Sequence, residues 1–290
     1  MGRCAAVHRF YILWIFGRCE DEYRCVGPIT PGSGFKFYIN DADGFFQFAS
    51  HPWYGEPSYR TAQRAPGRQA GDGPGSLFST LFAGGDPDYR VLLADRIYKA
   101  YFNEGALTPA RTAAPLNVRC DELEAVFVAE AARWGYRTPA DWLAVREDVS
   151  SRWLPTRTEV VLGELRAAGL YPGLDAALLN QLGGVVRAGF EVFFTDPPKG
   201  DIFFTIDGSD PRLPGGVLAP AARRYAAGAL PIRPGSPLLS SIATRPVIDR
   251  NTVLKVRACE GKQWSALNET YFQTDGGALK PGEITIMELN

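Results

Sequence analysis

The stretch "FFTIDGSDPRLPGG", residues 203–216, combines a strand pattern with two turn signals. Phe204 and Ile206 face one side of the predicted strand, and the residues between them alternate to the other side. Asp207 is followed by glycine and predicts a tight turn, and Asp210 is followed by proline and predicts a second one. The stretch therefore predicts a strand that ends in two consecutive turns.

Other strand-like runs lie on both sides of this stretch. They are short, rich in β-branched and aromatic residues, and separated by Pro, Gly and Asp. The runs are "VVRAGFEVFFT", "DIFFTIDG", "TVLKVRACEG" and "ETYFQT". They predict a small β-sandwich from about 185 to 275, with a strand spacing that fits an immunoglobulin-like module.

Three further features make this prediction more specific: Tyr225, the run "LKVRA" at 254–258 and the pair "WS" at 264–265. Together with the opening stretch, they resemble the C-terminal domain of chitobiases and β-hexosaminidases over residues 185–272. The resemblance implies an immunoglobulin-like sandwich that is appended to many secreted bacterial proteins and is not their catalytic part.

The chain before this region, from Ser76 to about Leu170, has the apolar periodicity of helices. Its first long helix is "PDYRVLLADRIYKAYFNEG", for which Asp86 is the predicted N-cap and Pro87 the first helical residue. Gly105 is expected to end that helix.

Later helices are expected to begin at Thr-Pro pairs. Thr108 is the predicted cap of a helix that Pro115 should kink or restart. Thr138 begins another, with Asp141 placed for a capping box. The last helix, "TRTEVVLGELRAAG", should end at Gly169.

Three tryptophans, Trp134, Trp142 and Trp153, fall in or beside these helices. Large aromatic side chains are buried on average in folded domains. We therefore expect all three to lie in the core.

The stretch "LLADRIYKAYFNEGALTPAR", residues 92–111, resembles the helical C-terminal part of the CotH kinase family, the spore-coat-type atypical kinases. The resemblance extends forward to about Ala177 and back to "GFKFYINDADGFF". It implies an α+β multidomain chain, in which a helical kinase-like C-lobe remnant precedes the immunoglobulin-like β-sandwich.

The two resemblances imply a domain map. Residues 1–34 precede the metal strand, and 35–177 form the kinase-like helical part, with a Gly/Pro-rich loop at 50–75. Residues 185–275 form the β-sandwich, and 276–290 form a linker and the start of a further domain. The closing "EITIMELN" is similar to the first strand of a lamin-tail domain.

Asp41 and Asp43 are the candidate metal ligands. Both follow the aromatic run "FKFYI", and the CotH resemblance implies that carboxylates here hold the Mg²⁺ that bridges ATP phosphates. Asn-Asp-x-Asp-Gly is also a good polar turn, so both interpretations stay open. The same holds for Asp207 and Asp210, for which turn chemistry competes with a cation or sugar contact.

The other parts of a kinase site are not recognisable in the sequence. Residues 1–34 contain no lysine to contact ATP phosphates, and no residue is assigned as the catalytic base. We therefore expect a fragment that lacks the ATP-binding lobe, binds no cofactor itself, and does not bind ATP with useful affinity.

Composition excludes several classes. Lys and Arg number 31 against 32 Asp and Glu, which argues against a nucleic-acid partner. No apolar run is long enough to span a membrane. The five cysteines contain no CxxC and have no nearby histidine pair, which makes a zinc site improbable.

Two functions remain at this point. The first is a secreted CotH-type kinase-like protein that, when intact, transfers phosphate from ATP to a protein or cell-surface substrate. The second is a non-catalytic cell-surface or carbohydrate-associated module that acts through the β-sandwich. Both place the protein outside the cell or on its surface, by resemblance.

Overall fold

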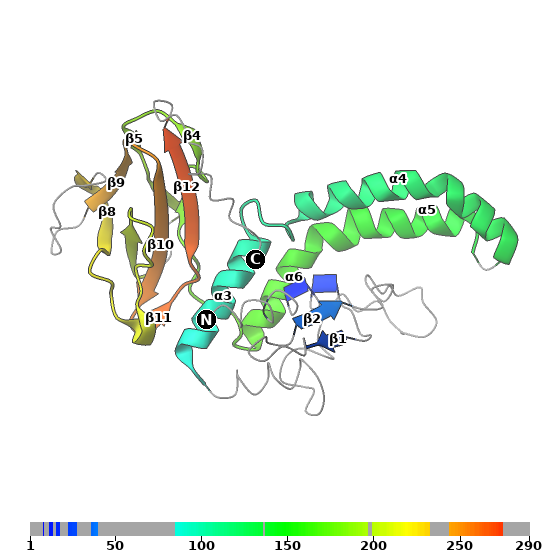
Figure 1. Ribbon diagram of the computed structural model, residues 1–290, viewed down its shortest axis with the longest axis horizontal. Helices are drawn as coiled ribbons and strands as arrows, with labels where there is room; N and C mark the ends of the chain where they lie inside the picture. Colours follow the sequence, from blue (N-terminus) through cyan, green and yellow to red (C-terminus); the bar gives the residue numbers. More distant parts are fainter. Residues whose placement is uncertain are drawn as a thin grey trace. The chain divides into compact units, whose positions relative to one another are not determined.

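The computed structural model describes residues 8, 12–13, 16–17, 23–27, 36–39, 85–135, 137–196, 199–232 and 244–274 (Figure 1). Contacts divide the chain into two compact units. Unit 1 comprises residues 1–85 and 99–169, and unit 2 comprises residues 86–98 and 170–290. One of the boundaries between them falls inside helix α3, Pro87–Tyr101.

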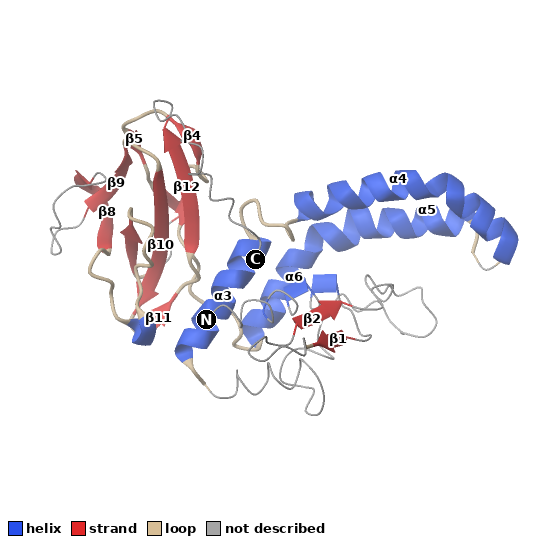
Figure 2. Ribbon diagram, in the orientation of Figure 1, coloured by secondary structure: helices blue, strands red, loops and turns tan. Residues whose placement is uncertain are grey.

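Unit 1 combines a strand pair with helices. Strand β1, Tyr23–Val26, pairs antiparallel with β2, Lys36–Ile39. The helices are α4 (Pro109–Trp134), α5 (Pro139–Asp148) and α6 (Leu154–Ala167), with a π-helical turn, η2 (Val149–Trp153), between the last two. In Figure 2, α4 and α5 lie side by side, and Phe127 of α4 stacks on Trp142 of α5 at a centroid distance of 4.9 Å.

Two helix starts follow the predicted capping signals, while Thr108, predicted as the cap of α4, precedes that helix without a side-chain cap hydrogen bond. The backbone N–H of Asp88 donates to Asp86 Oδ1 at 2.9 Å, directly before α3 begins. At α5, Thr138 and Asp141 form the predicted capping box, in which each side chain accepts from the other's backbone N–H. These local signals fix the starts of α3 and α5.

Two prolines in this region act differently. Pro115, predicted to kink or restart a helix, does not restart one, because α4 continues through it from Pro109 to Trp134. Before Pro155, by contrast, the N–H of Leu154 donates to the carbonyl of Val149, five residues earlier. Pro155 then has no N–H to donate, which accounts for the wider π-helical turn at this point.

The described core of unit 1 gathers around Phe16. Its ring lies 5.7 Å from that of Tyr101 and 5.8 Å from that of Trp153. Trp153 is buried as predicted, but Trp134 is 63 % exposed, so its predicted place in the core is wrong. Trp134 is the last residue of α4, and the guanidinium of Arg133 lies 4.8 Å from its ring centroid.

Unit 2 contains the first part of α3 and a mixed β-sheet. The strand order along the sheet is β4 (Gly184–Val186), β12 (Asn268–Thr274), β10 (Thr252–Glu260), β7 (Asp201–Thr205), β8 (Arg223–Ile232), β9 (Thr244–Ile248) and β5 (Phe190–Glu191). Strand β11 (Gln263–Trp264) pairs with β10, while β3 (Leu178–Leu179) and β6 (Phe194–Asp196) form a separate pair. The β12–β4 and β8–β9 pairs are parallel.

This sheet is curled, so that strands from its two ends share one core. Phe190 belongs to the last strand of the path and Phe272 to the second, yet their ring centroids are 5.8 Å apart. Phe204, Leu254 and Val256 from the central strands lie in the same buried cluster. The coarse prediction of an α+β chain is therefore confirmed.

Pairing fixes which residues face the inside of the curl. Phe204 is a core residue, and both Val256 and Arg223 lie directly opposite it on neighbouring strands. These side chains face the interior. Phe203 is opposite Arg257 and lies on the outer face, because side chains alternate along a strand.

Candidate functional site

The predicted metal ligands, Asp41 and Asp43, lie outside the described residues. Strand β2 ends at Ile39, so the predicted strand before them exists and is paired with β1. The loop at 50–75 and the segment 276–290 also lie outside the described ranges. The metal prediction therefore stays a prediction.

The two predicted turns after β7 are present. Ser209 donates from its backbone N–H and its hydroxyl to Asp207 Oδ1, at 2.9 and 2.6 Å. Arg212 likewise donates its backbone N–H to Asp210 Oδ1 at 2.9 Å. Both aspartates thus make the local turn chemistry that their sequence predicts.

Asp210 also has a long-range partner, Arg257 on the outer face of β10. Arg257 Nε donates to Asp210 Oδ1 at 2.8 Å, and Nη2 donates to Oδ2 at 2.6 Å. This is a bidentate pair along one edge of the guanidinium, the strong arrangement of arginine with a carboxylate.

The other edge of the same guanidinium binds Asp95 of α3, which belongs to unit 2. Nη1 donates to Asp95 Oδ1 and Nη2 to Oδ2, both at 2.7 Å. Nη1 also donates to the carbonyl of Ser265 at 3.0 Å. Asp95 Oδ1 accepts a further bond from the backbone N–H of Leu267, at 2.8 Å. All five guanidinium N–H groups of Arg257 therefore have an acceptor.

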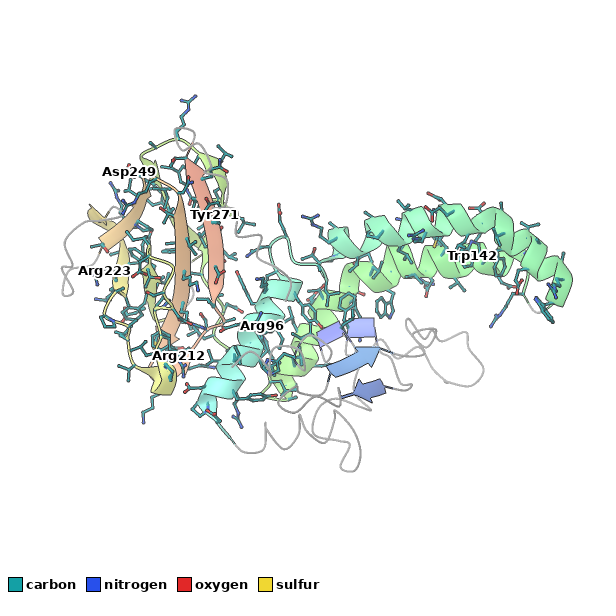
Figure 3. All side chains as sticks on the ribbon, in the orientation of Figure 1. Arg96, Trp142, Arg212, Arg223, Asp249 and Tyr271 are labelled. Atoms are coloured by element: carbon teal, nitrogen blue, oxygen red, sulfur yellow. The ribbon has the colours of Figure 1, made fainter. Side chains whose placement is uncertain are left out.

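A second pair extends this network along α3. Asp88 lies seven residues before Asp95, two helical turns away on the same face. It binds Nη2 of Arg212 and accepts the backbone N–H of Gly215 at 2.9 Å. Figure 3 labels Arg212 near α3. We call the five side chains Asp88, Asp95, Asp210, Arg212 and Arg257 the arginine–aspartate cluster.

Electrostatics favour the ionised form of three members of the cluster, Asp88, Asp210 and Arg257. Burial alone would raise the pKa of Asp210, but the hydrogen bonds and positive charge of Arg257 outweigh it and lower the pKa below its usual range. The hydrogen bond from Arg212 lowers the pKa of Asp88. Burial opposes the charge of Arg257, yet its two aspartates raise its pKa. These three groups therefore stay ionised at neutral pH.

The arrangement is suited to holding elements together. Its carboxylates are already bound to guanidinium and backbone N–H groups, so none is placed to act as a proton acceptor for a substrate. It joins α3 residues 87–98, the turns after β7, strand β10 and the β11–β12 connection within unit 2. We interpret the cluster as structural.

Sequence reasoning missed this cluster except for the turn at Asp210. Asp95 and Arg257 are 162 residues apart in the sequence. Asp95 lies on a helix with ordinary amphipathic spacing, and Arg257 occupies an outward position of an alternating strand. Neither pattern indicates that Asp95 and Arg257 would contact each other.

Other reactive groups of the described chain are dispersed. Within the described ranges, no three His, Cys, Asp or Glu side chains are grouped so that they could hold a metal ion. Cys120 is a buried free thiol, and its burial raises its pKa. Among the same residues, no helix is both long and apolar enough to cross a membrane.

Comparisons with known proteins add no relative to this picture. No family model, no curated protein and no solved structure matches the chain.

Proposed function

We propose that the chain contains the kinase-like helical part of a CotH-type phosphoryl-transfer protein, joined to a non-catalytic β module in unit 2. The intact activity would move phosphate from ATP to a protein outside the cell or on its surface. The proposal rests on the sequence resemblance together with the position of the predicted metal ligands.

One observation carries the catalytic part. Strand β2 ends at Ile39, paired with β1, and the two carboxylates Asp41 and Asp43 come two and four residues later in the sequence. Mg²⁺ prefers hard oxygen ligands, and phosphoryl transfer uses such a metal to neutralise charge on the phosphates. Asp41 and Asp43 would supply two of these ligands.

The positions of the helices support the same proposal. Helix α3 contains "ADRIYKAY", the central part of the CotH-like stretch, and α4 begins at Pro109 within "LTP".

For unit 2, the curled sheet around Phe204, Val256 and Phe272 supports an immunoglobulin-like module of the chitobiase type.

Metal binding by the chain tests this proposal directly, because the sequence alone predicts no cofactor on this chain, whereas the proposed site at Asp41 and Asp43 requires a divalent ion. Mn²⁺ can replace Mg²⁺ as a probe, and calorimetry should show a site that the double variant Asp41→Asn/Asp43→Asn loses. The matched control is Glu122→Gln/Glu130→Gln, which removes the same charge from the exposed surface of α4. Equal Mn²⁺ binding by all three proteins would remove the basis of the metal assignment.

Nucleotide binding is a separate measurement. We expect Mg-ATP to bind this chain more weakly than micromolar, because the segment 1–34 offers no lysine for the phosphates. A micromolar dissociation constant would mean that the nucleotide site uses residues we have not assigned.

The second candidate is a cell-surface or carbohydrate-associated module without catalysis. It is favoured by the arginine–aspartate cluster, because the clustered carboxylates of unit 2 are committed to internal bonds. A glycan array probed with the full chain tests it, with the Asp41→Asn/Asp43→Asn protein as a control. Binding to a polysaccharide by both proteins would favour this candidate over the kinase.

A further inference from the structure

A second buried arginine, Arg223, lies at the start of β8 and is labelled in Figure 3. It pairs with Phe204, so its side chain faces the interior of the curled sheet. Only 2 % of Arg223 is exposed. The next residue, Arg224, pairs with Phe203 on the outer face and binds the exposed Asp201. Adjacent arginines thus have opposite environments.

The guanidinium of Arg223 is fixed at one end. Nη1 donates to the carbonyl oxygens of Pro220 and Ala222, at 3.2 and 2.8 Å. These two bonds use both hydrogens of Nη1. They hold the guanidinium plane against the turn before β8 and leave the Nε–Nη2 edge on the far side.

That second edge is buried and has no hydrogen-bond acceptor among the residues that the structure describes. Nε and Nη2 of Arg223 are both buried and both lack a hydrogen-bond partner within the described chain. Almost every buried polar atom in a protein has a partner, so an exception of this size points to a water or an ion. A buried guanidinium whose donors have no acceptor is especially costly.

Strand β9, next to β8, contributes a buried hydroxyl that also lacks a hydrogen-bond partner among the described residues. In the parallel β8–β9 pair, Thr244 of β9 lies at a register shift, opposite both Tyr225, two residues after Arg223, and Leu230. Thr244 is buried, and within the described chain its Oγ has no partner. Neighbouring strands lie about 4.8 Å apart and two residues along a strand span about 6.6 Å, so the backbones at Arg223 and Thr244 are about 8 Å apart, a gap that an arginine side chain and a small ion can bridge. One small group could therefore contact both side chains.

The chain itself shows what such an edge binds. In Arg257, the same pair of nitrogens, Nε and Nη2, holds the two carboxylate oxygens of Asp210 at 2.8 and 2.6 Å. In Arg223 the equivalent edge has no such acceptor within the described chain. We propose that Arg223 and Thr244 form a binding site for a small oxyanion, whose two oxygens accept from Nε and Nη2 and whose further oxygen meets the threonine hydroxyl.

Carboxylate, sulfate and phosphate ions share this chemistry. Asp207 is a nearby negative charge whose Oδ1 accepts from Ser209. Against the effect of burial, the hydrogen bonds from Ser209 and the charge of Arg223 lower its pKa, but it makes no hydrogen bond to Arg223 within the described chain. The confined interior favours a small ion over a large ligand. This inference is independent of the proposed kinase activity.

The first experiment is a titration of the full chain with acetate, sulfate or inorganic phosphate, at ionic strength balanced with chloride. A ligand that binds the native state raises the folded-to-unfolded ratio about a hundredfold at about 100 times its dissociation constant. We expect one saturable site in calorimetry and this gain in unfolding curves. The anion with the lowest dissociation constant identifies which of these three oxyanion types the site prefers.

Three variants assign the site. Arg223→Met should abolish the anion-dependent gain, while Arg224→Met, which removes the same charge one residue away, should keep it. Arg223→Lys should weaken it at least tenfold, because a lysine cannot offer two parallel donors. Sulfate also stabilises proteins by exclusion from their surface, but that effect would be the same in all variants.

A measurement on the unmodified protein keeps the test independent of variant folding. The Arg223 Nε–H resonance in a ¹⁵N-labelled sample should shift on anion addition and saturate with the calorimetric curve. Two results would overturn the proposal: no preference of the wild-type chain for any of the three anions over chloride, or undiminished binding by folded Arg223→Met. The first would mean that water or another part of the chain satisfies this edge.

Discussion

Arg257 in unit 2 and Arg146 in the α4–α5 hairpin of unit 1 each bind two carboxylates from elsewhere in the chain. Arg146 binds Asp121 at 2.6 Å and Glu124 at 3.2 Å. The side chain of Arg146 is 22 % exposed, against 2 % for Arg257. The distances are similar, so distance alone does not rank these two networks.

The two networks differ in the solvent exposure of their side chains and in the number of hydrogen bonds that the arginine donates. Asp121 and Glu124 are about half-exposed or more, so water and salt can replace the arginine. Asp95 and Asp210 are less accessible to water, and Arg257 uses all its donors. The same ion-pair chemistry should therefore be essential in unit 2 and almost dispensable in the hairpin.

The largest effect is expected for Arg257→Met. It leaves Asp95 and Asp210 beside each other in a largely buried place without their shared counter-charge, which should lower the stability of unit 2 by about 3–5 kcal/mol. Hydrogen exchange followed on peptides from β10 and β12 measures this unit separately. Arg224→Met, which breaks the exposed pair with Asp201, is the matched control and should change little. A loss below about 1 kcal/mol for Arg257→Met would mean that burial does not decide the comparison.

Asp95→Asn should cost less, about 2 kcal/mol, because the amide keeps one acceptor but turns an N–H toward Arg257. The double variant Asp95→Asn/Arg257→Met sharpens the test. It should be more stable than the sum of the single changes predicts, since the neutral amide introduced by Asp95→Asn leaves no unpaired buried charge at that position. The same hydrogen-exchange peptides measure the coupling, and strict additivity would show that the two side chains do not act as a pair.

These two variants concern contacts that sequence reasoning could not reach. Local signals were sufficient for the start of α3 at Asp86 and Pro87, and for the Thr138–Asp141 capping box, because both depend on neighbours within a few residues. The partnership of Asp95 with Arg257 depends on how the chain brings α3 to the sheet. No alternation or helical period encodes that partner.

The residues singled out from the sequence show the same difference between local and long-range signals. The turns at Asp207 and Asp210 were predictable from their own sequence, and both are present. The core position of Trp134 was wrong, because helical spacing cannot tell that α4 ends there against solvent. For Asp41 and Asp43 the preceding strand is present, and the metal role remains a prediction.

A smaller effect is expected from acid. The pKa of Asp210 is lower in the folded chain than the unfolded value of about 3.9. Its stabilisation is therefore complete above that unfolded value and is lost as the pH falls through the folded pKa. The difference in stability between wild type and Asp210→Asn should be constant from about pH 6 to 7 and shrink below about pH 4. Denaturant curves at several pH values measure this, and a pH-independent difference would exclude the ionic contribution of Asp210.

The smallest effect is expected for Arg146→Met in the hairpin. The variant breaks the pairs with Asp121 and Glu124, but both carboxylates can be hydrated where they are, so the melting temperature of unit 1 should fall by only about 1–2 °C at low salt. In about 1 M NaCl the Debye length shrinks to about 3 Å, and the difference should disappear. The cost of Arg257→Met should survive the same salt, because burial keeps ions away from that guanidinium.

Arg119→Met is the control for this hairpin variant. It breaks the exposed pair with Glu122 on α4 alone, so it removes the same charge without removing a link between two helices. Its effect should be no larger than that of Arg146→Met, since water can solvate both partners of the exposed pair. The opposite result would be that Arg146→Met loses as much stability as Arg257→Met and keeps that loss at high salt. That result would show that linking two elements matters more than burial.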